Sequence, residues 1–347
     1  MFIPQAKMKK AVSINDIAEA LGLSRNTVSK ALNGHHVPNK TRETVLRKAQ
    51  ELNYKSLNNN LLSSHKYRLL LLSGKPLHNM NFYVPLVKSV ENYCYDRNYD
   101  FFEFTYNASD GSFEKIAAYV HGLRVDGIVA IECFEPAFVN SLLNLGVPTC
   151  FIDFPGRKFE AEKKYDLITA HDQKAVCEYV KTLYEQYKIR RFTFVGDIRH
   201  CLSFHERYMG MLRGLSRSGL RHSVEEDLIM DDNAFDYGDS NALKDKILFH
   251  RAMPDCFICC NDFVARNVAT AIRKIGYRIP EDTMVVGFDG VAEAEERAPL
   301  ITTFYVDKEF LGQEAIRLLV SRIEKKDAPS RTIMVDCDLI VRESTTK

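Results

Sequence analysis

Near its start the chain repeats apolar residues at the spacing of an α-helix. The positions i, i+3, i+4 and i+7 are held by Ile14, Ile17, Ala18 and Leu21. This spacing predicts a helix with one buried face. Ser13 can cap its first turn, and Gly22 has the backbone freedom that ends a helix.

Two further amphipathic helices are expected in the same segment. The second opens at Ser24 and closes at Asn33-Gly34, and its apolar positions are Val28, Ala31 and Leu32. The third begins at Lys40, and its apolar positions are Val45, Ala49 and Leu52. Three short helices with matching apolar faces predict a compact bundle.

The first two helices, joined by a short turn with a glycine, have the pattern of a helix-turn-helix that inserts its second helix into the major groove of DNA. Arg25, Asn26 and Lys30 lie on the exposed face of that second helix, where they can read base edges. The hydroxyls expected to meet phosphates are Ser13, Ser24, Thr27 and Ser29. The alternative is an ordinary solvated helical face.

The charge distribution favours DNA over that alternative. Residues 1–66 carry 11 Lys and Arg against 4 Asp and Glu, whereas residues 67–347 carry 36 against 42. The near-neutral total therefore hides a basic head on an acidic body, and a polyanion partner is expected for the head alone.

Beyond Lys66 short apolar runs alternate with amphipathic helices. The expected strands are RLLLLS from 68, FFEFTY from 101, GIVAI from 127, TCFID from 149, RFTFVG from 191, DCFICC from 255, MVVGFD from 284, TTFYVD from 302 and TIMVDCDLIV from 332. The expected helices are 83–97, 112–121, 172–187, 204–218, 262–275 and 308–324. Continuous apolar runs indicate buried parallel strands, so the pattern predicts two doubly wound α/β halves.

Ligands of parallel sheets collect at the carboxyl ends of the strands, where polar residues recur in this chain. Asp153 follows one run, Asn261 another and Asp289 a third, while Arg207 lies on the helix after RFTFVG. Together they suit a neutral molecule with neighbouring hydroxyls, such as a sugar or polyol. Each alone is equally explained as a helix cap or a surface ion pair, and Asp262 is expected to cap its helix.

The head segment SINDIAEALGLSRNTVSKALN resembles the motif T-x-x-D-V-A-x-x-A-G-V-S-x-x-T-V-S-R-x-L-N of the lac repressor family. The resemblance implies a DNA-binding head at 8–54 and a hinge linker at 55–66. Family hinges read Y-x-P-N-x-x-A-R-x-L and wedge the final Leu into the minor groove, but Ser56 and Ser63 stand at the Pro and Leu positions here. Either Leu62 wedges in a shifted register beside Leu61, or the hinge bends DNA little.

The resemblance continues through the core. SFHERYMGMLRGL is similar to F-x-x-R-x-x-G-F-x-x-A-L, and CNDFVARNVATAIRKIGYRIPEDTMVVGFDG is similar to a long family motif that begins N-D and ends G-F-D-D. This implies effector contacts for Asp153, Arg207, Asn261 and Asp289. Phe82 and Tyr83 could supply a stacking face or pack in the core, and Phe235 could supply an aromatic wall, although strict spacing puts Asn233 there.

The resemblance also implies a fold class: an all-α helix-turn-helix head joined to an α/β core of two doubly wound parallel-sheet subdomains of periplasmic-binding-protein type. The core, 67–347, is expected to divide into 67–168 with 302–328 and 169–301 with 329–347. We expect a homodimeric repressor that binds double-stranded operator DNA under control of a sugar-like effector. The alternatives are a sugar receptor without a DNA role and a regulator controlled by a protein partner.

Other classes are disfavoured. No Walker A loop, G-x-S-x-G, H-E-x-x-H or G-x-G-x-x-G is present, so no enzyme and no cofactor is expected. The Cys256 and Cys259 pair has half the spacing of a zinc site but lacks a second pair, so no metal is expected. The chain has no apolar run of membrane-spanning length and no export signal at its start, so we expect a cytoplasmic protein.

Overall fold

The computed structural model describes residues 12–32, 37–52, 54, 66–74, 80–106, 113–155, 163–249, 252–291 and 300–346. The chain divides into two compact units, Met1–Arg68 with Tyr95–Asp100 and Leu69–Cys94 with Phe101–Lys347. No helix in the described ranges is both long and apolar enough to cross a membrane.

The head has the three predicted helices, α1 (Ile14–Leu21), α2 (Arg25–Leu32) and α3 (Asn39–Glu51). The Asp16 amide donates to Ser13 Oγ over 3.4 Å and the Ser13 amide donates to Asp16 Oδ2 over 2.6 Å, so a capping box begins α1. Gly22, with φ of 63°, ends α1 as predicted. The core of the bundle is formed by Ile17, Ala18, Val28, Ala31, Leu32, Val45, Ala49 and Tyr54.

The first lobe of the core is a six-stranded sheet in the order β10-β5-β4-β3-β1-β2. Its strands are β1 (Arg68–Gly74), β2 (Asp100–Tyr106), β3 (Gly127–Ile131), β4 (Thr149–Ile152), β5 (Asp166–Ala170) and β10 (Thr332–Val335). Its helices are α5 (Met80–Asp96), α6 (Phe113–Leu123), α7 (Pro136–Asn144) and α12 (Lys308–Glu324). The pairs β10–β5, β5–β4, β4–β3 and β3–β1 are parallel.

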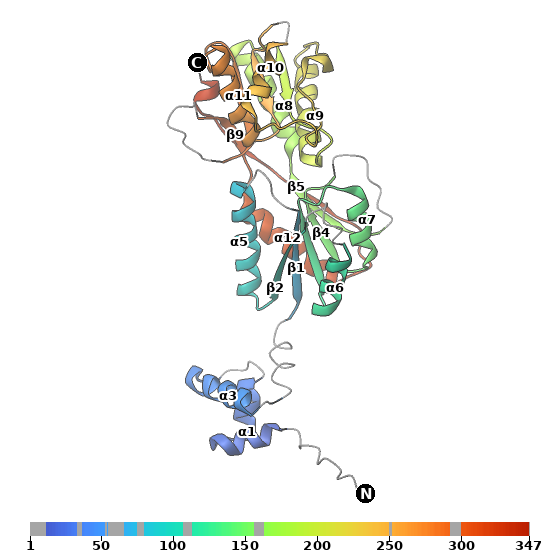
Figure 1. The fold of residues 1–347 in the computed structure, drawn as a ribbon, viewed down its shortest axis with the longest axis vertical. Helices are drawn as coiled ribbons and strands as arrows, with labels where there is room; N and C mark the ends of the chain where they lie inside the picture. The colour runs from blue at the N-terminus through green and yellow to red at the C-terminus, as the bar shows by residue number, and fades with distance from the viewer. Residues whose placement is uncertain are drawn as a thin grey trace, which may run out of the picture. The chain divides into compact units, whose positions relative to one another are not determined.

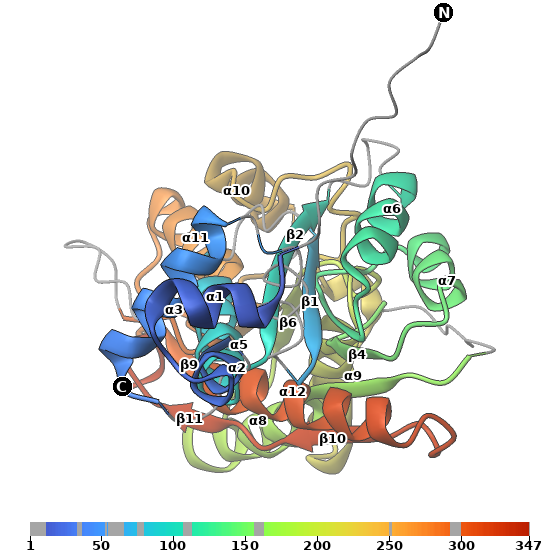
Figure 2. The ribbon, with the colours of Figure 1, turned by 90° about the horizontal axis from the view of Figure 1, so that it is seen from below.

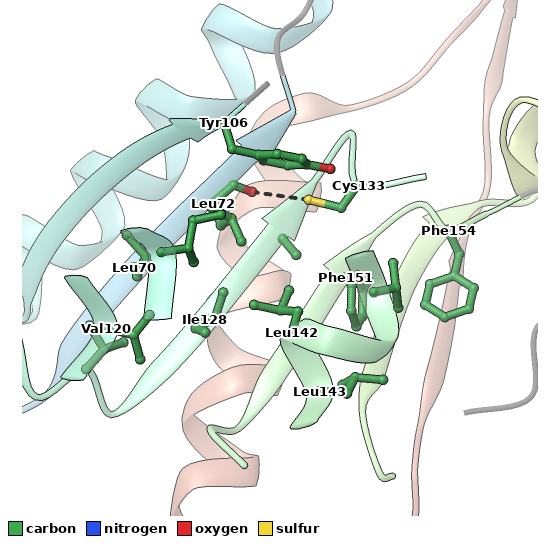
Figure 3. Close-up of a cluster of buried hydrophobic side chains, with 14 of the residues drawn as sticks. Leu70, Leu72, Tyr106, Val120, Ile128, Cys133, Leu142, Leu143, Phe151 and Phe154 are labelled. Atoms are coloured by element: carbon green, nitrogen blue, oxygen red, sulfur yellow. Dashed lines mark hydrogen bonds between the residues drawn. The ribbon is translucent and has the colours of Figure 1, made fainter. Parts of the chain in front are cut away.

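Helices cover both faces of this sheet. Figure 2 shows α6 and α7 side by side on one side of the sheet and α12 on the other. Figure 3 shows the apolar core under α6 and α7, where Val120 and Leu142 meet Leu70 and Ile128 of the strands. At its edge the Cys133 thiol lies 3.8 Å from the carbonyl of Leu72.

The second lobe is a five-stranded sheet in the order β11-β9-β8-β7-β6. Its strands are β6 (Phe192–Val195), β7 (Cys256–Cys259), β8 (Met284–Asp289), β9 (Thr302–Tyr305) and β11 (Asp338–Ile340). Its helices are α8 (Asp172–Tyr187), α9 (Leu202–Arg217), α10 (Ser240–Leu248) and α11 (Asp262–Ile275), with short helical turns η2 (Val224–Glu226) and η3 (Glu343–Thr345). Only the β11–β9 pair is antiparallel among the described pairs of this sheet.

Two glycines let α8 and α9 pack closely. A Cβ at Gly214 would lie 2.8 Å from Val180 Cβ, and one at Gly210 would lie 2.7 Å from the Gln173 carbonyl oxygen. Both distances are shorter than an ordinary contact, so any larger residue would force the helices apart. Figure 1 shows these two helices, α8 and α9, in the same lobe as α10 and α11.

The predicted fold class is confirmed, but the predicted subdomain boundaries need correction. The expected boundary at residue 168 cuts through β5, which lies wholly in the first sheet. The range 302–328 was expected in the first subdomain, yet β9 pairs with β8 of the second sheet. The single strand expected from 332 is two strands: β10 joins the first sheet, and β11 joins the second. The reason is that the chain crosses between the lobes inside ranges that looked continuous.

Among the described α-helices and strands, α7, α10 and β5 were not predicted, nor were the short turns η2 and η3. In β5 the cause is a buried charge, because Asp166 at its start interrupts the apolar run. The carboxylate of Asp166 accepts from Arg322 over 2.6 Å and from Arg331 over 2.7 Å, and its side chain is inaccessible to solvent. Burial would raise the pKa of Asp166, but the two guanidinium groups hold that pKa below its usual value.

Candidate functional site

The exposed face of α2 carries the side chains predicted to read DNA bases. Arg25, Asn26 and Lys30 are all exposed, while Val28 on the opposite face is fully buried. The helix is therefore held by its apolar side and presents its donors to solvent. Long cationic and amide side chains in this arrangement can reach base edges in the major groove.

The hydroxyls of the head also have structural roles. Ser24 Oγ accepts from the Thr27 amide over 3.1 Å, which caps α2, and lies 2.8 Å from Thr27 Oγ1. Ser13 caps α1, and Ser29 is half-buried. Leu61 and Leu62 of the predicted hinge lie outside the described residues.

A cleft of about 1060 Å³ lies between the two lobes of the core. Six of the seven residues predicted to bind an effector line it: Phe82, Asp153, Arg207, Phe235, Asn261 and Asp289. Asn233 lines it too. The cleft is therefore where the carboxyl ends of strands from both sheets meet, as parallel-sheet topology leads one to expect.

Tyr83 is the exception and packs inside the first lobe. Its hydroxyl lies 2.7 Å from Ser73 Oγ and 2.9 Å from Glu103 Oε1, and the side chain is buried. Burial raises the pKa of Tyr83 to about 12. These contacts match the alternative in which Tyr83 packs in the core.

Arg207 is the centre of a buried polar network. Its Nε donates to Asp172 Oδ1 over 3.0 Å, and its Nη1 donates to the carbonyl of Cys260. Its Nη2 lies 3.6 Å from Asp289 Oδ1, and the guanidinium stacks 3.7 Å from the ring centroid of Phe288. Burial raises the pKa of Asp172, an effect that the guanidinium opposes. Arg207 thus orders the floor of the cleft.

Three strand ends turn into the cleft with left-handed backbone. The φ angles are 56° at Glu132 after β3, 62° at Asp153 after β4 and 104° at Asp289 in β8. Such values are unusual for residues other than glycine, and they concentrate at functional sites. Asp153 Oδ1 also accepts from the Ser203 amide over 3.2 Å, which links the two lobes beside the cleft that both residues line.

The cap of α11 differs from the sequence expectation. Asn261, rather than Asp262, is the capping residue, because Asn261 Oδ1 accepts from the Val264 amide over 2.9 Å. Asp262 instead lies buried and accepts from the Val291 amide over 2.7 Å. Burial, helped by the charge of Asp289, raises the pKa of Asp262 to about 7.

Sequence reasoning missed several residues of the cleft wall. Glu132 directly follows the strand GIVAI, so the rule that selected Asp153 would have found it. Phe134 and His200 come from loops of different lobes, and their meeting has no local signal. His200 Nδ1 lies 2.6 Å from Asp232 Oδ2, and although burial would lower the pKa of His200, this pair raises it.

In the described ranges one group of side chains has the spacing of metal ligands: Asp197, Asp231 and Asp232. These carboxylates are already occupied by cations, since Arg199 Nε lies 3.2 Å from Asp197 Oδ1 and His200 pairs with Asp232. Cys256 and Cys259 are buried in β7. The three aspartates are therefore explained by internal ion pairs, and the two cysteines are explained by packing in the core.

Two family models match the chain. The model of bacterial regulatory proteins of the lacI family matches residues 13–56, and a periplasmic binding protein-like domain matches residues 180–345. The HTH-type transcriptional repressor PurR of Mannheimia succiniciproducens is 26% identical over 344 residues, covering 96% of this chain and 99% of that protein. PurR of Pasteurella multocida is 27% identical over 347 residues, covering 96% and 98%.

Solved structures agree with these matches. A complex of the transcriptional regulator CelR with cellobiose is 25% identical with a TM-score of 0.69, covering 96% of this chain and 99% of that chain. A lac repressor dimer bound to operator and the anti-inducer ONPF is 20% identical with a TM-score of 0.73, covering 97% and 100%. The second likeness shows a shared fold.

Proposed function

The chain belongs to the lac repressor family of DNA-binding transcriptional repressors, and we propose that a hydroxyl-rich molecule in its cleft sets its affinity for operator DNA. The observation that carries this proposal is the convergence of Asp153, Asn261 and Asp289 from both lobes on one cleft. Carboxylate and amide oxygens accept from hydroxyls, and amide nitrogens donate to them. The complex of the similar regulator CelR with cellobiose supports a sugar or polyol here.

The DNA contacts that we propose come from the exposed face of α2. Arg25, Asn26 and Lys30 would read base edges, with Ser13, Ser24, Thr27 and Ser29 contributing hydroxyls near phosphates. Two heads are needed to bind the two halves of a near-palindromic operator, so we propose a homodimer. The predicted linker, 55–66, would join each head, 8–54, to its core.

Regulation would follow from closure of the cleft. A molecule that contacts both lobes favours the closed form in proportion to its extra contacts there. If closure changes the separation of the two heads of a dimer, the operator and the effector become thermodynamically linked. Phe82, Phe235 and Arg207 would contact or support the bound molecule.

An electrophoretic mobility shift assay tests this function. DNA selected by the protein from random duplexes is titrated with the full chain, with and without a panel of sugars and polyols. We expect specific binding that at least one compound alters severalfold. Specific DNA binding that no compound alters would support control by a protein partner instead, and sugar binding without DNA binding would support a receptor.

The hinge can be tested in the same complex. If Leu62, beside Leu61, wedges into the minor groove, the wild type bends DNA strongly and Leu62→Ala bends it less. Equal strong bending in both proteins would exclude Leu62 as the wedge.

A further inference from the structure

The described cations on the cleft wall are already matched by acidic partners of the second lobe. Arg199 Nε donates to Asp197 Oδ1 over 3.2 Å, and His200 Nδ1 lies 2.6 Å from Asp232 Oδ2. Arg207 is held in the buried network under the cleft. An anionic ligand would therefore have to compete with internal carboxylates for each of these cations.

Glu132 lies on the opposite wall and is differently placed. It lines the cleft at the end of β3, is half-buried, and its side chain makes no hydrogen bond to any residue in the described ranges. Burial raises the pKa of Glu132 to about 7, which the charges of Asp153 and Asp289 reinforce and His200 opposes. A half-buried carboxylate without donors ionises less readily than one in water, so a ligand that brings donors and positive charge would stabilise its ionised form.

Two other carboxylates of the cleft also favour a ligand with hydrogen-bond donors and positive charge. The charges of Asp153 and Asp289 raise the pKa of Glu132, and both side chains line the same cleft, where Asp289 also faces Arg207 at 3.6 Å. Three acidic side chains thus share one region between the lobes. An ammonium group has three donors and no acceptor, which matches a set of groups that only accept when ionised.

Aromatic rings also line the cleft. Phe134, Phe204 and Phe235 line the cleft, and each is partly exposed to it. The faces of such rings attract cations and also pack against the apolar faces of sugar rings. Carboxylates beside aromatic faces are the surroundings that proteins use to hold a positively charged nitrogen on an otherwise polar molecule.

We propose that the effector is an amino sugar or amino polyol, and that Glu132 binds its protonated amine. This inference rests on the proposed function, since it assigns a chemical class to the molecule in the regulatory cleft. It replaces the neutral effector that four residues of the sequence suggested. Hydroxyls meet Asn261 and the strand-end carboxylates, while the ammonium meets Glu132.

Isothermal titration calorimetry on the full chain tests the inference with matched pairs of ligands. The amines are glucosamine, galactosamine, mannosamine and the corresponding amino alditols, and each is compared with its hydroxyl parent. We expect at least one amine to bind about tenfold or more tightly than its parent, as a charge-assisted hydrogen bond allows. A parent that binds as tightly as the best amine, or a panel in which no amine binds, overturns the inference.

Two variants localise the effect. Glu132→Gln keeps the size of the side chain and is expected to reduce the preference for amine over parent to about unity. Glu135→Gln is the matched control, because Glu135 lines the same cleft but is exposed and makes no side-chain cap to α7. Retention of the amine preference in Glu132→Gln, or its loss in both variants, would exclude Glu132 as the ammonium site.

The DNA assay separates failure of this inference from failure of the proposed function. If a neutral parent alters operator binding and no amine does so, the proposed regulatory function is supported and the amine site is excluded. If an amine binds with the predicted preference while operator affinity is unchanged, the amine site stands and regulation through the cleft is excluded.

Discussion

The imidazole of His200 lies edge-on against the ring of Phe134, with 4.9 Å between the ring centroids and 67° between the planes. Phe134 belongs to the loop after β3 in the first lobe, and His200 belongs to the loop after β6 in the second. The contact therefore joins the two lobes at the wall of the cleft, which both residues line. Aromatic pairs of this kind contribute roughly 0.5–1.5 kcal/mol beyond the area they bury.

Phe134→Ala is expected to shift the ligand-free protein towards a more open cleft, because it removes this contact between the lobes. Electron–electron resonance between spin labels on α6 and α10 would measure a longer and broader distance distribution. Phe235→Ala is the control, since the Phe235 ring pairs with Tyr237 of the same lobe at 5.1 Å. Identical distributions in wild type and Phe134→Ala would show that the contact does not set closure.

Arg207→Ala is expected to destabilise the protein by about 3–5 kcal/mol, because it leaves the carboxylate of Asp172 buried without its charge partner. One carboxylate oxygen of Asp172 has no hydrogen bond even in the wild type. Few contacts would therefore stabilise the negative charge of Asp172 once Arg207 is removed. Arg213→Ala, on the exposed side of the same helix, should change stability by less than about 0.5 kcal/mol. Urea unfolding of both variants measures the difference, and equal losses would contradict the role of the network.

Gly214→Ala is expected to cost about 1–3 kcal/mol, because the new methyl group would collide with Val180 across the α8–α9 contact. Gly122→Ala in α6 is the matched control. A Cβ at Gly122 meets no atom within 4 Å, and alanine is the better helix former by roughly 0.5–1 kcal/mol. Thermal unfolding should therefore move in opposite directions for the two variants, and a shared direction would argue against close packing as the cause.

Glu132→Gln should change how stability depends on pH. The folded pKa of Glu132, about 7, lies above the ordinary value of 4.5, so the folded state holds a proton that the unfolded state releases earlier. Wild-type stability therefore falls as pH rises between these values. The variant has no such loss, so it should be the more stable protein above pH 7, with the difference vanishing near pH 4.5. Parallel pH profiles from urea titrations would contradict burial of the carboxyl.

Arg25→Ala and Asn26→Ala are each expected to weaken binding to the selected operator by roughly 1–3 kcal/mol while non-specific binding changes little. Both side chains are exposed, so the unfolding temperature of the head should stay the same. Fluorescence anisotropy on the operator and on a scrambled duplex provides the comparison. Equal weakening on both duplexes would assign these residues to phosphate contacts.

The sequence predicted those parts of the fold that depend on local spacing. The apolar stripe of α1 and the continuous run of β1 are visible within a few residues, and both elements form where expected. The start of β5 was hidden because Asp166 is a buried charge whose partner, Arg322, is distant in sequence. The lobe to which β9 belongs depends on pairing with β8, which no local pattern reports.

The candidate site divides in the same way. Asp153 and Asp289 could be predicted because residues that follow parallel strands gather at one edge of a sheet. The pairing of Arg207 with Asp172 and the meeting of Phe134 with His200 could not, since each joins segments brought together only by the tertiary fold. Glu132 also follows a parallel strand, so the same reasoning applies to it, but it was not predicted.

The order of strands in the first sheet has a consequence for synthesis on the ribosome. The strand β10, Thr332–Val335, pairs with Asp166–Ala170, and β11, Asp338–Ile340, completes the second sheet. The head helices α1, α2 and α3 lie within residues 14–51 and can fold soon after they emerge, whereas neither sheet has all of its described strands until residues 332–340 are made. A nascent chain therefore acquires a folded head before it acquires a complete core, and translation of the final strands determines when the molecule can first respond to a ligand.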